Sequence, residues 1–264
     1  MNWVTFLNSA NQISSAIPMA WFLRPQTSCH RRLIHKGGQT MQRQNGFTLI
    51  EIAIVLVIIG LLLGGVLKGQ ELIQSARVRN LISHQDGVKA AYFGFLDRYR
   101  ALPGDYTTAN ANANIPGCGT SCFGGDANGQ IGGSEAIHAW EHLSKAGFIT
   151  GSYVSGSATP TAGTANTPSN PYGSLVQLIY DGTYQNGGTA TGPNRHNLKT
   201  GNNVPSDILA EVDRKIDDGL GNAGQVRFST FGGAVNTGQE CFNTTTGAWQ
   251  SATPNANCGA ATLF

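Results

Sequence analysis

The stretch RQNGFTLIEIAIVLVIIGLLLGGVLKG, residues 43–69, decides the fold of this chain. Residues 52–67 carry no charge, and the apolar run 47–67 would form about 31 Å of helix. That length matches the hydrocarbon core of a bilayer, whereas a secretory signal peptide would be shorter and followed by a small-residue cleavage site. The sequence therefore predicts one membrane-spanning helix whose basic flank, including Arg43, stays in the cytoplasm.

Glu51 lies near the start of this apolar run. An ionised carboxylate inside a membrane costs several kcal/mol unless a partner compensates it, so such a residue indicates a function. Cleavage between Gly46 and Phe47 would create a new α-amino group about one helical turn from Glu51. We expect the carboxylate to pair with this amine, on its own chain or on a neighbouring one.

The sequence Gly46-Phe-Thr-Leu-Ile-Glu51 resembles the prepilin processing motif of type IV pilins and type II secretion pseudopilins. The resemblance extends from Met41 to about Ala101. It implies that a prepilin peptidase cleaves after Gly46 and that Phe47 is then N-methylated, while Glu51 sets the register between subunits of a filament. It also implies other partners, namely copies of the chain, other pilins and an inner-membrane assembly platform with its ATPase.

The chain departs from this family in two ways. No proline stands about twenty residues into the mature helix, where the family often has one. That region instead holds four glycines, which predict close helix packing or local unwinding: Gly60, Gly64, Gly65 and Gly69.

The second departure is the length of sequence before Gly46. A start at Met41 would give the short basic leader MQRQNG, residues 41–46. We therefore interpret residues 1–40 as sequence that is not translated. The alternative is a cytoplasmic extension that is removed on processing.

Beyond the apolar run the pattern becomes amphipathic, and we expect one helix over residues 47–101, ended by Pro103-Gly104. Residues 102–264 would form a head in which loops dominate, since 26 of these 163 residues are Gly. Helices are predicted at 134–145, capped by Ser134, and at 206–218. Strands are predicted at 174–180, at 225–231 and near Trp249, with loops at 152–171 and 182–203. The predicted fold class is α+β, a long helix on a small antiparallel sheet.

Four cysteines lie in the head, at Cys118, Cys122, Cys241 and Cys258. An even number behind a membrane segment favours two disulfides in an oxidising compartment, although a zinc site is an alternative. The pairing Cys118–Cys122 and Cys241–Cys258 closes the shortest loops. The second pair also resembles the C-terminal disulfide loop of many pilins.

Two patterns in the head raise the question of a bound metal. GDANGQI, residues 125–131, resembles the first half of a calcium loop with ligands at Asp126 and Asn128. The twelfth position is Ile137 rather than an acid, so Glu135 would have to substitute, and a simple turn is the alternative. His138 and His142 have metal-ligand spacing but no evident third ligand. We expect them to be surface or partly buried side chains.

The charge and motif content exclude several functions. Residues 47–264 carry 12 basic and 15 acidic groups, a net of −3, with no basic stripe for nucleic acid. The sequence contains no nucleophile elbow, P-loop or dinucleotide fingerprint, and we predict no enzyme. The expected function is a filament subunit, in the inner membrane before assembly and periplasmic or on the cell surface afterwards. The alternative is a non-polymerising, membrane-anchored periplasmic binding protein, and the sequence leaves pilus and secretion pseudopilus both open.

Overall fold

The structure is a computed structural model that describes residues 46–234 and 239–264. Residues 41–45 of the predicted leader and the extension before them lie outside the described residues. By internal contacts the chain divides into two units, Met1–Ile52 and Ala53–Phe264. The second unit holds most of the long helix and the whole head.

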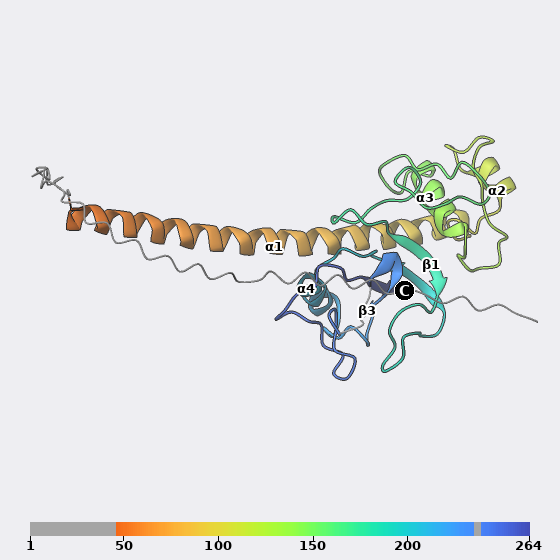
Figure 1. The fold of residues 1–264 in the computed structure, drawn as a ribbon. Coiled ribbons are helices and arrows are strands. Elements are labelled where there is room, and N and C mark those ends of the chain that lie inside the picture. The colour runs from red at the N-terminus through yellow and green to blue at the C-terminus, as the bar shows by residue number, and fades with distance from the viewer. Residues whose placement is uncertain (1–45, 235–238) are drawn as a thin grey trace, which may run out of the picture. The chain divides into compact units, whose positions relative to one another are not determined.

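Helix α1 runs without interruption over Leu49–Tyr99, close to the predicted bounds (Figure 1). It passes through the four glycines as regular α-helix, so the single chain shows no unwinding there. The helix ends where Arg100 adopts a positive φ of 54°. In its second half, buried residues recur mostly at intervals of three or four: Val78, Leu81, Gln85, Val88, Ala91, Tyr92 and Phe95. This stripe is the face that the head covers.

The sheet has four antiparallel strands in the order β1-β2-β4-β3. The strands are β1 Gln177–Asp181, β2 Arg195–Lys199, β3 Val226–Phe228 and β4 Ala260–Leu263. Leu178, Leu198, Thr262 and Val226 are register partners across all four strands, and all four are buried. Thr262 donates a hydrogen bond of 2.5 Å to the buried Gln85 of α1. This row of the sheet therefore faces the helix.

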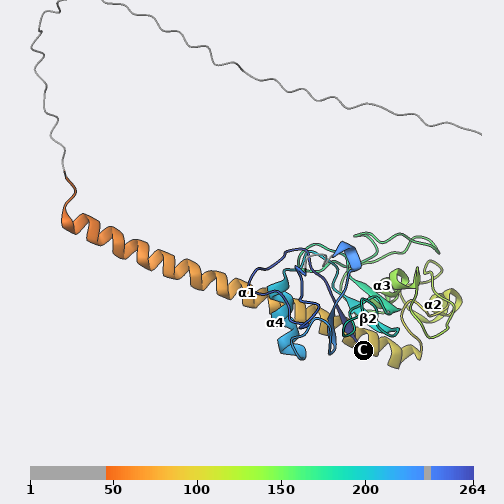
Figure 2. The same cartoon turned by 60° about the horizontal axis from the view of Figure 1, so that its bottom comes forward.

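The described part of the head also contains three further helices, α2 Thr108–Asn114, α3 Glu135–Lys145 and α4 Ser206–Ile216, and a short 3-10 helix, η1, at Phe231–Gly233 (Figures 1 and 2). Gly147 follows α3 because the turn that ends this helix requires a residue with a positive φ. Gly147 has φ 79°, which lets its N–H bond to Ser144 and the next N–H, from Phe148, bond to Leu143.

The buried residues of α1 join two hydrophobic clusters. Val88, Ala91, Tyr92 and Phe95 pack with α3 and the loops around it. Val78 and Leu81 pack with α4, β3 and the C-terminal region. Each cluster contains one disulfide, Cys118–Cys122 in the first and Cys241–Cys258 in the second, which is the predicted pairing.

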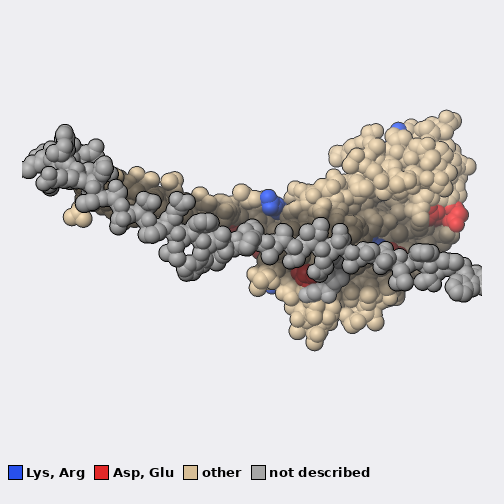
Figure 3. All heavy atoms as spheres, viewed as in Figure 1, with Lys and Arg blue, Asp and Glu red and all other residues tan. Residues whose placement is uncertain are grey.

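The face of the molecule in Figure 3 carries few charged side chains.

The fold class and the two longer head helices are confirmed, but two local predictions are wrong and two elements, β4 and α2, were not predicted. The predicted loop 182–203 contains β2, and the strand expected near Trp249 is only an isolated bridge between Phe242 and Trp249. The fourth strand is β4 instead. No prediction covered α2, whose sequence TANANAN lacks apolar periodicity.

Candidate functional site

The peptide bond between Gly46 and Phe47 lies before the first residue of α1. Phe47 is 84% exposed, and a Cβ added at Gly46 would meet no atom within 4 Å. None of the described residues therefore covers the Gly46–Phe47 peptide bond. Arg43, the predicted basic flank, lies outside the described residues.

Thr48 and Glu51 form reciprocal hydrogen bonds at the start of α1. The backbone N–H and the hydroxyl of Thr48 each donate to Glu51 Oε2 at 2.8 Å, and the N–H of Glu51 donates to Thr48 Oγ1 at 3.3 Å. This is a capping box, in which a Thr and a Glu three residues later satisfy free backbone N–H groups. Sequence reasoning missed Thr48, although the Thr-x-x-Glu pattern was visible.

Glu51 therefore has a partner within its own chain, and it also keeps acceptor capacity. Both bonds from Thr48 go to Oε2, and no described residue donates to Oε1. A cation that approached Oε1 would not have to displace Thr48. The capping box thus orients the carboxylate and leaves one oxygen for a further donor.

The apolar part of α1 has no covering in the single chain. Its most apolar 18-residue window has a mean hydropathy of 2.8, and none of that window is buried. By length and composition, α1 is the one described helix that could cross a membrane. A Cβ added at Gly60, Gly64, Gly65 or Gly69 would meet no atom within 4 Å. The proposed packing role of these glycines needs a second helix, so it stays a prediction.

Comparison with known proteins bears on this N-terminal segment. The family described as the prokaryotic N-terminal methylation motif matches residues 41–67. Residues 41–67 carry the N-methylation motif of the type IV pilin and type II pseudopilin family. Its members are typically non-enzymatic structural proteins, and the family implies prepilin peptidase processing and filament assembly. No curated protein and no solved structure matches the chain.

The motif and the apolar helix that contains most of it suggest anchoring in the inner membrane. The prepilin motif covers only the first half of α1 and the residues before it. The head therefore has to be interpreted from its own geometry.

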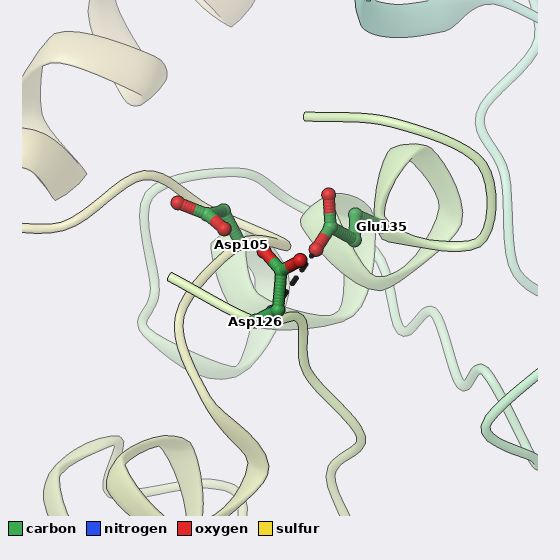
Figure 4. A group of neighbouring side chains, drawn as sticks. All are labelled: Asp105, Asp126 and Glu135. Atoms are coloured by element: carbon green, nitrogen blue, oxygen red, sulfur yellow. Dashed lines mark hydrogen bonds between the residues drawn. The ribbon is translucent and has the colours of Figure 1, made fainter. Parts of the chain in front are cut away.

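Asp126 and Glu135, two of the predicted calcium ligands, lie close together in the head with a third acid, Asp105 (Figure 4). Carboxylate oxygens of the three residues are all within 4.8 Å of one another. Asp105 lies in the turn after α1, and Glu135 is the first residue of α3. Sequence reasoning missed Asp105 because it stands 21 residues before Asp126, outside any local motif.

Most oxygens of this acidic cluster already accept hydrogen bonds from the loop that holds it. Asp105 accepts from the N–H groups of Asn128 and Gly129 at 3.0 and 2.9 Å. Glu135 accepts from Gly132 at 2.8 Å and from Asp126 at 3.2 Å. Asn128 uses its side-chain oxygen for the N–H of Gln130. The predicted ligand Asn128 thus acts as a turn residue.

Electrostatics in this cluster disfavour three simultaneous negative charges. Burial raises the pKa of Glu135, and the neighbouring charges of Asp105 and Asp126 add to the effect, while the hydrogen bonds from Gly132 and Asp126 oppose it. A divalent cation bound here would relieve that repulsion. In the absence of a cation, protonation of Glu135 would do the same.

His138 and His142 are both fully buried, which corrects the expectation of surface or partly buried side chains. His142 Nδ1 accepts from the N–H of Gly104 at 3.0 Å, so Nε2 carries the proton and donates to the carbonyl of Phe123 at 2.8 Å. His138 contacts Ser155 Oγ at 2.9 Å and the carbonyl of Ala158 at 3.3 Å. Because all four ring nitrogens have partners, neither histidine is placed to ligate a metal.

Proposed function

We propose that the chain is a structural subunit of a type IV pilus-like or type II secretion pseudopilus-like filament. It would be made as a membrane-inserted prepilin with leader 41–46, cleaved after Gly46, N-methylated at Phe47 and then polymerised. The observation that carries this proposal is the prepilin motif at residues 41–67, whose apolar helical part is exposed in the single chain. Such a surface needs lipid before assembly and neighbouring helices after it.

Glu51 would act in assembly through the oxygen that Thr48 leaves free. Cleavage places the Phe47 amine one residue before the capping box, and a neighbouring subunit could bring its own Phe47 amine to Oε1. In an apolar surrounding this attraction offsets part of the cost of burying the carboxylate. A misplaced neighbour would leave the charge unpaired. The proposed role of Glu51 is therefore to set register.

The proposed partners follow from this role. They are copies of the chain, other pilins, the prepilin peptidase and the inner-membrane assembly platform with its ATPase. The subunit would move from the inner membrane to a periplasmic or cell-surface filament. Residues 1–40 would have no part in the mature protein, and we propose neither an enzymatic activity nor nucleic-acid binding for the head.

Shear fractionation of cells tests the filament role. Sheared material should contain the chain as a regular component of filaments, beginning at Phe47. A variant with a bulky residue, Gly46→Leu, should instead remain as precursor in the inner membrane. If the wild-type chain stayed entirely in the membrane fraction while other filament subunits were sheared off, the non-polymerising alternative would replace this proposal.

We further propose calcium as a structural ligand of the cluster formed by Asp105, Asp126 and Glu135. Three converging carboxylates match the preference of calcium for oxygen ligands. Chelation should then lower the melting temperature of the wild-type chain and leave that of Asp105→Asn unchanged. An identical melting curve of the wild type with and without chelator would contradict the calcium site and leave residues 125–131 as a simple turn.

A further inference from the structure

A cavity of about 380 Å³ lies in the wedge where α1 leaves the head, between α1 and the start of α4. Both cartoon views place α4 beside the middle of α1 (Figures 1 and 2). The cavity is lined mainly by Gln70, Ile73, Gln74 and Arg77 from α1 and by Asp207 and Ile208 from α4. The α1 residues recur at intervals of three and four, so they share one face of the helix.

If α1 spans the membrane, the end of this cavity nearest the lipid lies at the level of the headgroups. With Leu67 at the edge of the hydrocarbon, Gln70 lies about 4.5 Å and Arg77 about 15 Å further out. The headgroup layer is about 5–7 Å deep on each side. Helical side chains lean toward the N-terminus of their helix, and a long arginine can extend its charged end along an apolar surface. The guanidinium of Arg77 can therefore reach toward the headgroups.

The cavity presents one positive and one negative group that are not paired with each other. Asp207 Oδ2 accepts a hydrogen bond from Gln74 Nε2 at 2.7 Å, while no described residue donates to Oδ1. A carboxylate oxygen that lacks a donor and is shielded from water is costly. Arg77 lies 6.0 Å from the ring centroid of Tyr172 and has no ion-pair partner among the described residues.

We propose that this cavity binds the headgroup of a zwitterionic aminophospholipid of the surrounding membrane. The phosphate would bind Arg77, and the positive charge of the ammonium group would lie beside the Asp207 carboxylate, which has no charged partner within the described part of the chain. This proposal rests on the membrane insertion in the proposed function. An apolar helix of a second copy fits less well, because it would remove water from Arg77, Asp207 and the two glutamines without replacing its hydrogen bonds.

Native mass spectrometry of the full chain, released from nanodiscs of mixed phosphatidylethanolamine and phosphatidylglycerol, tests the proposal. The wild type should retain phosphatidylethanolamine. Arg77→Gln and Asp207→Asn should each retain about tenfold less, the effect of losing one charged contact. The matched controls are Arg79→Gln, which makes the same change on α1 outside the cavity, and Glu211→Gln, which does so one turn further along α4. Both should retain lipid like the wild type.

Three results would overturn the proposal. One is equal lipid retention by all five proteins, and another is equal loss in the controls. The third is efficient disulfide cross-linking of an Ile73→Cys variant between copies, which would assign the cavity to a second subunit. Free phosphoethanolamine added to the chain in detergent should bind at least tenfold more weakly, and tight binding of it would indicate a soluble ligand instead. Flotation of the same proteins with vesicles reports membrane insertion separately, so failure of the proposed function is distinguished from failure of the headgroup site.

Discussion

The two halves of α1 form one continuous helix but differ in which of their faces are apolar and exposed. Residues 53–67 are apolar on all sides and exposed, as Leu61 is at 73%, whereas the second half buries one stripe that includes Phe95 at 0%. A helix that is apolar all round needs an apolar surrounding, while an amphipathic helix needs one covered face. The head therefore covers the apolar face of the second half of α1 and leaves the first half uncovered. The first half depends on lipid or on other subunits.

Glu51 in the exposed half should show the largest effect of a single substitution. In the proposed filament, removing the Glu51 carboxylate would leave the Phe47 amine unpaired in an apolar surrounding, which strongly disfavours assembly. Glu51→Ala should therefore be inserted and cleaved, but filaments recovered by shearing should nearly disappear. Glu71→Ala is the control, because Glu71 is an exposed α1 acid paired with Lys68 at 2.7 Å. Wild-type filament abundance in Glu51→Ala would remove the register role.

A pair of truncations in α1 compares its halves directly. Phe95→Ala should lower the free energy of unfolding of the head by about 3–5 kcal/mol, because it leaves a cavity in the core. Leu61→Ala should change it by less than about 0.5 kcal/mol in detergent, since Leu61 contacts no core. Denaturant titration followed by tryptophan fluorescence measures both. Equal losses would mean that the first half also stabilises the head.

Acid should destabilise the packing of the head on the second half of α1. The residue responsible is His142, whose ring stacks on Phe95 with centroids 6.0 Å apart. Burial lowers the pKa of His142 to about 4, against an ordinary value of 6.5. The contribution of neutral His142 to the free energy of unfolding is thus complete above pH 6.5. It decreases by about 3 kcal/mol in total as the pH falls toward 4.

His142→Asn keeps an acceptor for Gly104 and should abolish this contribution to the pH dependence. The wild type and the variant must be compared as a difference. Asp213 titrates in the same range with the opposite sign, because burial raises its pKa to about 7 and it favours the fold at low pH. A difference in unfolding free energy that stays constant from pH 7 to pH 4 would contradict the role assigned to His142.

The two disulfides should differ in how much they support the head. A loop of 17 residues, as in Cys241–Cys258, predicts about 3 kcal/mol, and the short Cys118–Cys122 loop predicts about 2 kcal/mol. Paired serine variants, each measured by thermal unfolding of the full chain, give the two values. If removing Cys118–Cys122 destabilised the head more than removing Cys241–Cys258, local packing rather than loop length would determine how much each disulfide stabilises the head.

The sequence predicted those elements whose signal is local. The apolar run, the amphipathic stripe and the Pro-Gly stop gave α1 within two residues at each end, because they depend only on helical periodicity. Strand β2, RHNLK, was missed because its stability depends on distant partners. Lys199 is 2% exposed, and its ammonium group donates to Asp181, 18 residues earlier. Asp105 was missed for the same reason, since its neighbours in the acidic cluster, Asp126 in a loop and Glu135 at the start of α3, lie far along the chain.

The mature N-terminus tests the central claim most directly. The chain should be recovered from sheared filaments, and its N-terminal peptide sequenced by tandem mass spectrometry. A prepilin processed as proposed predicts a peptide that begins with N-methylated Phe47 and continues Thr48-Leu49-Ile50-Glu51. A chain that keeps Gly46 or any earlier residue in assembled filaments would contradict the account, because the Phe47 amine that Glu51 needs would not exist.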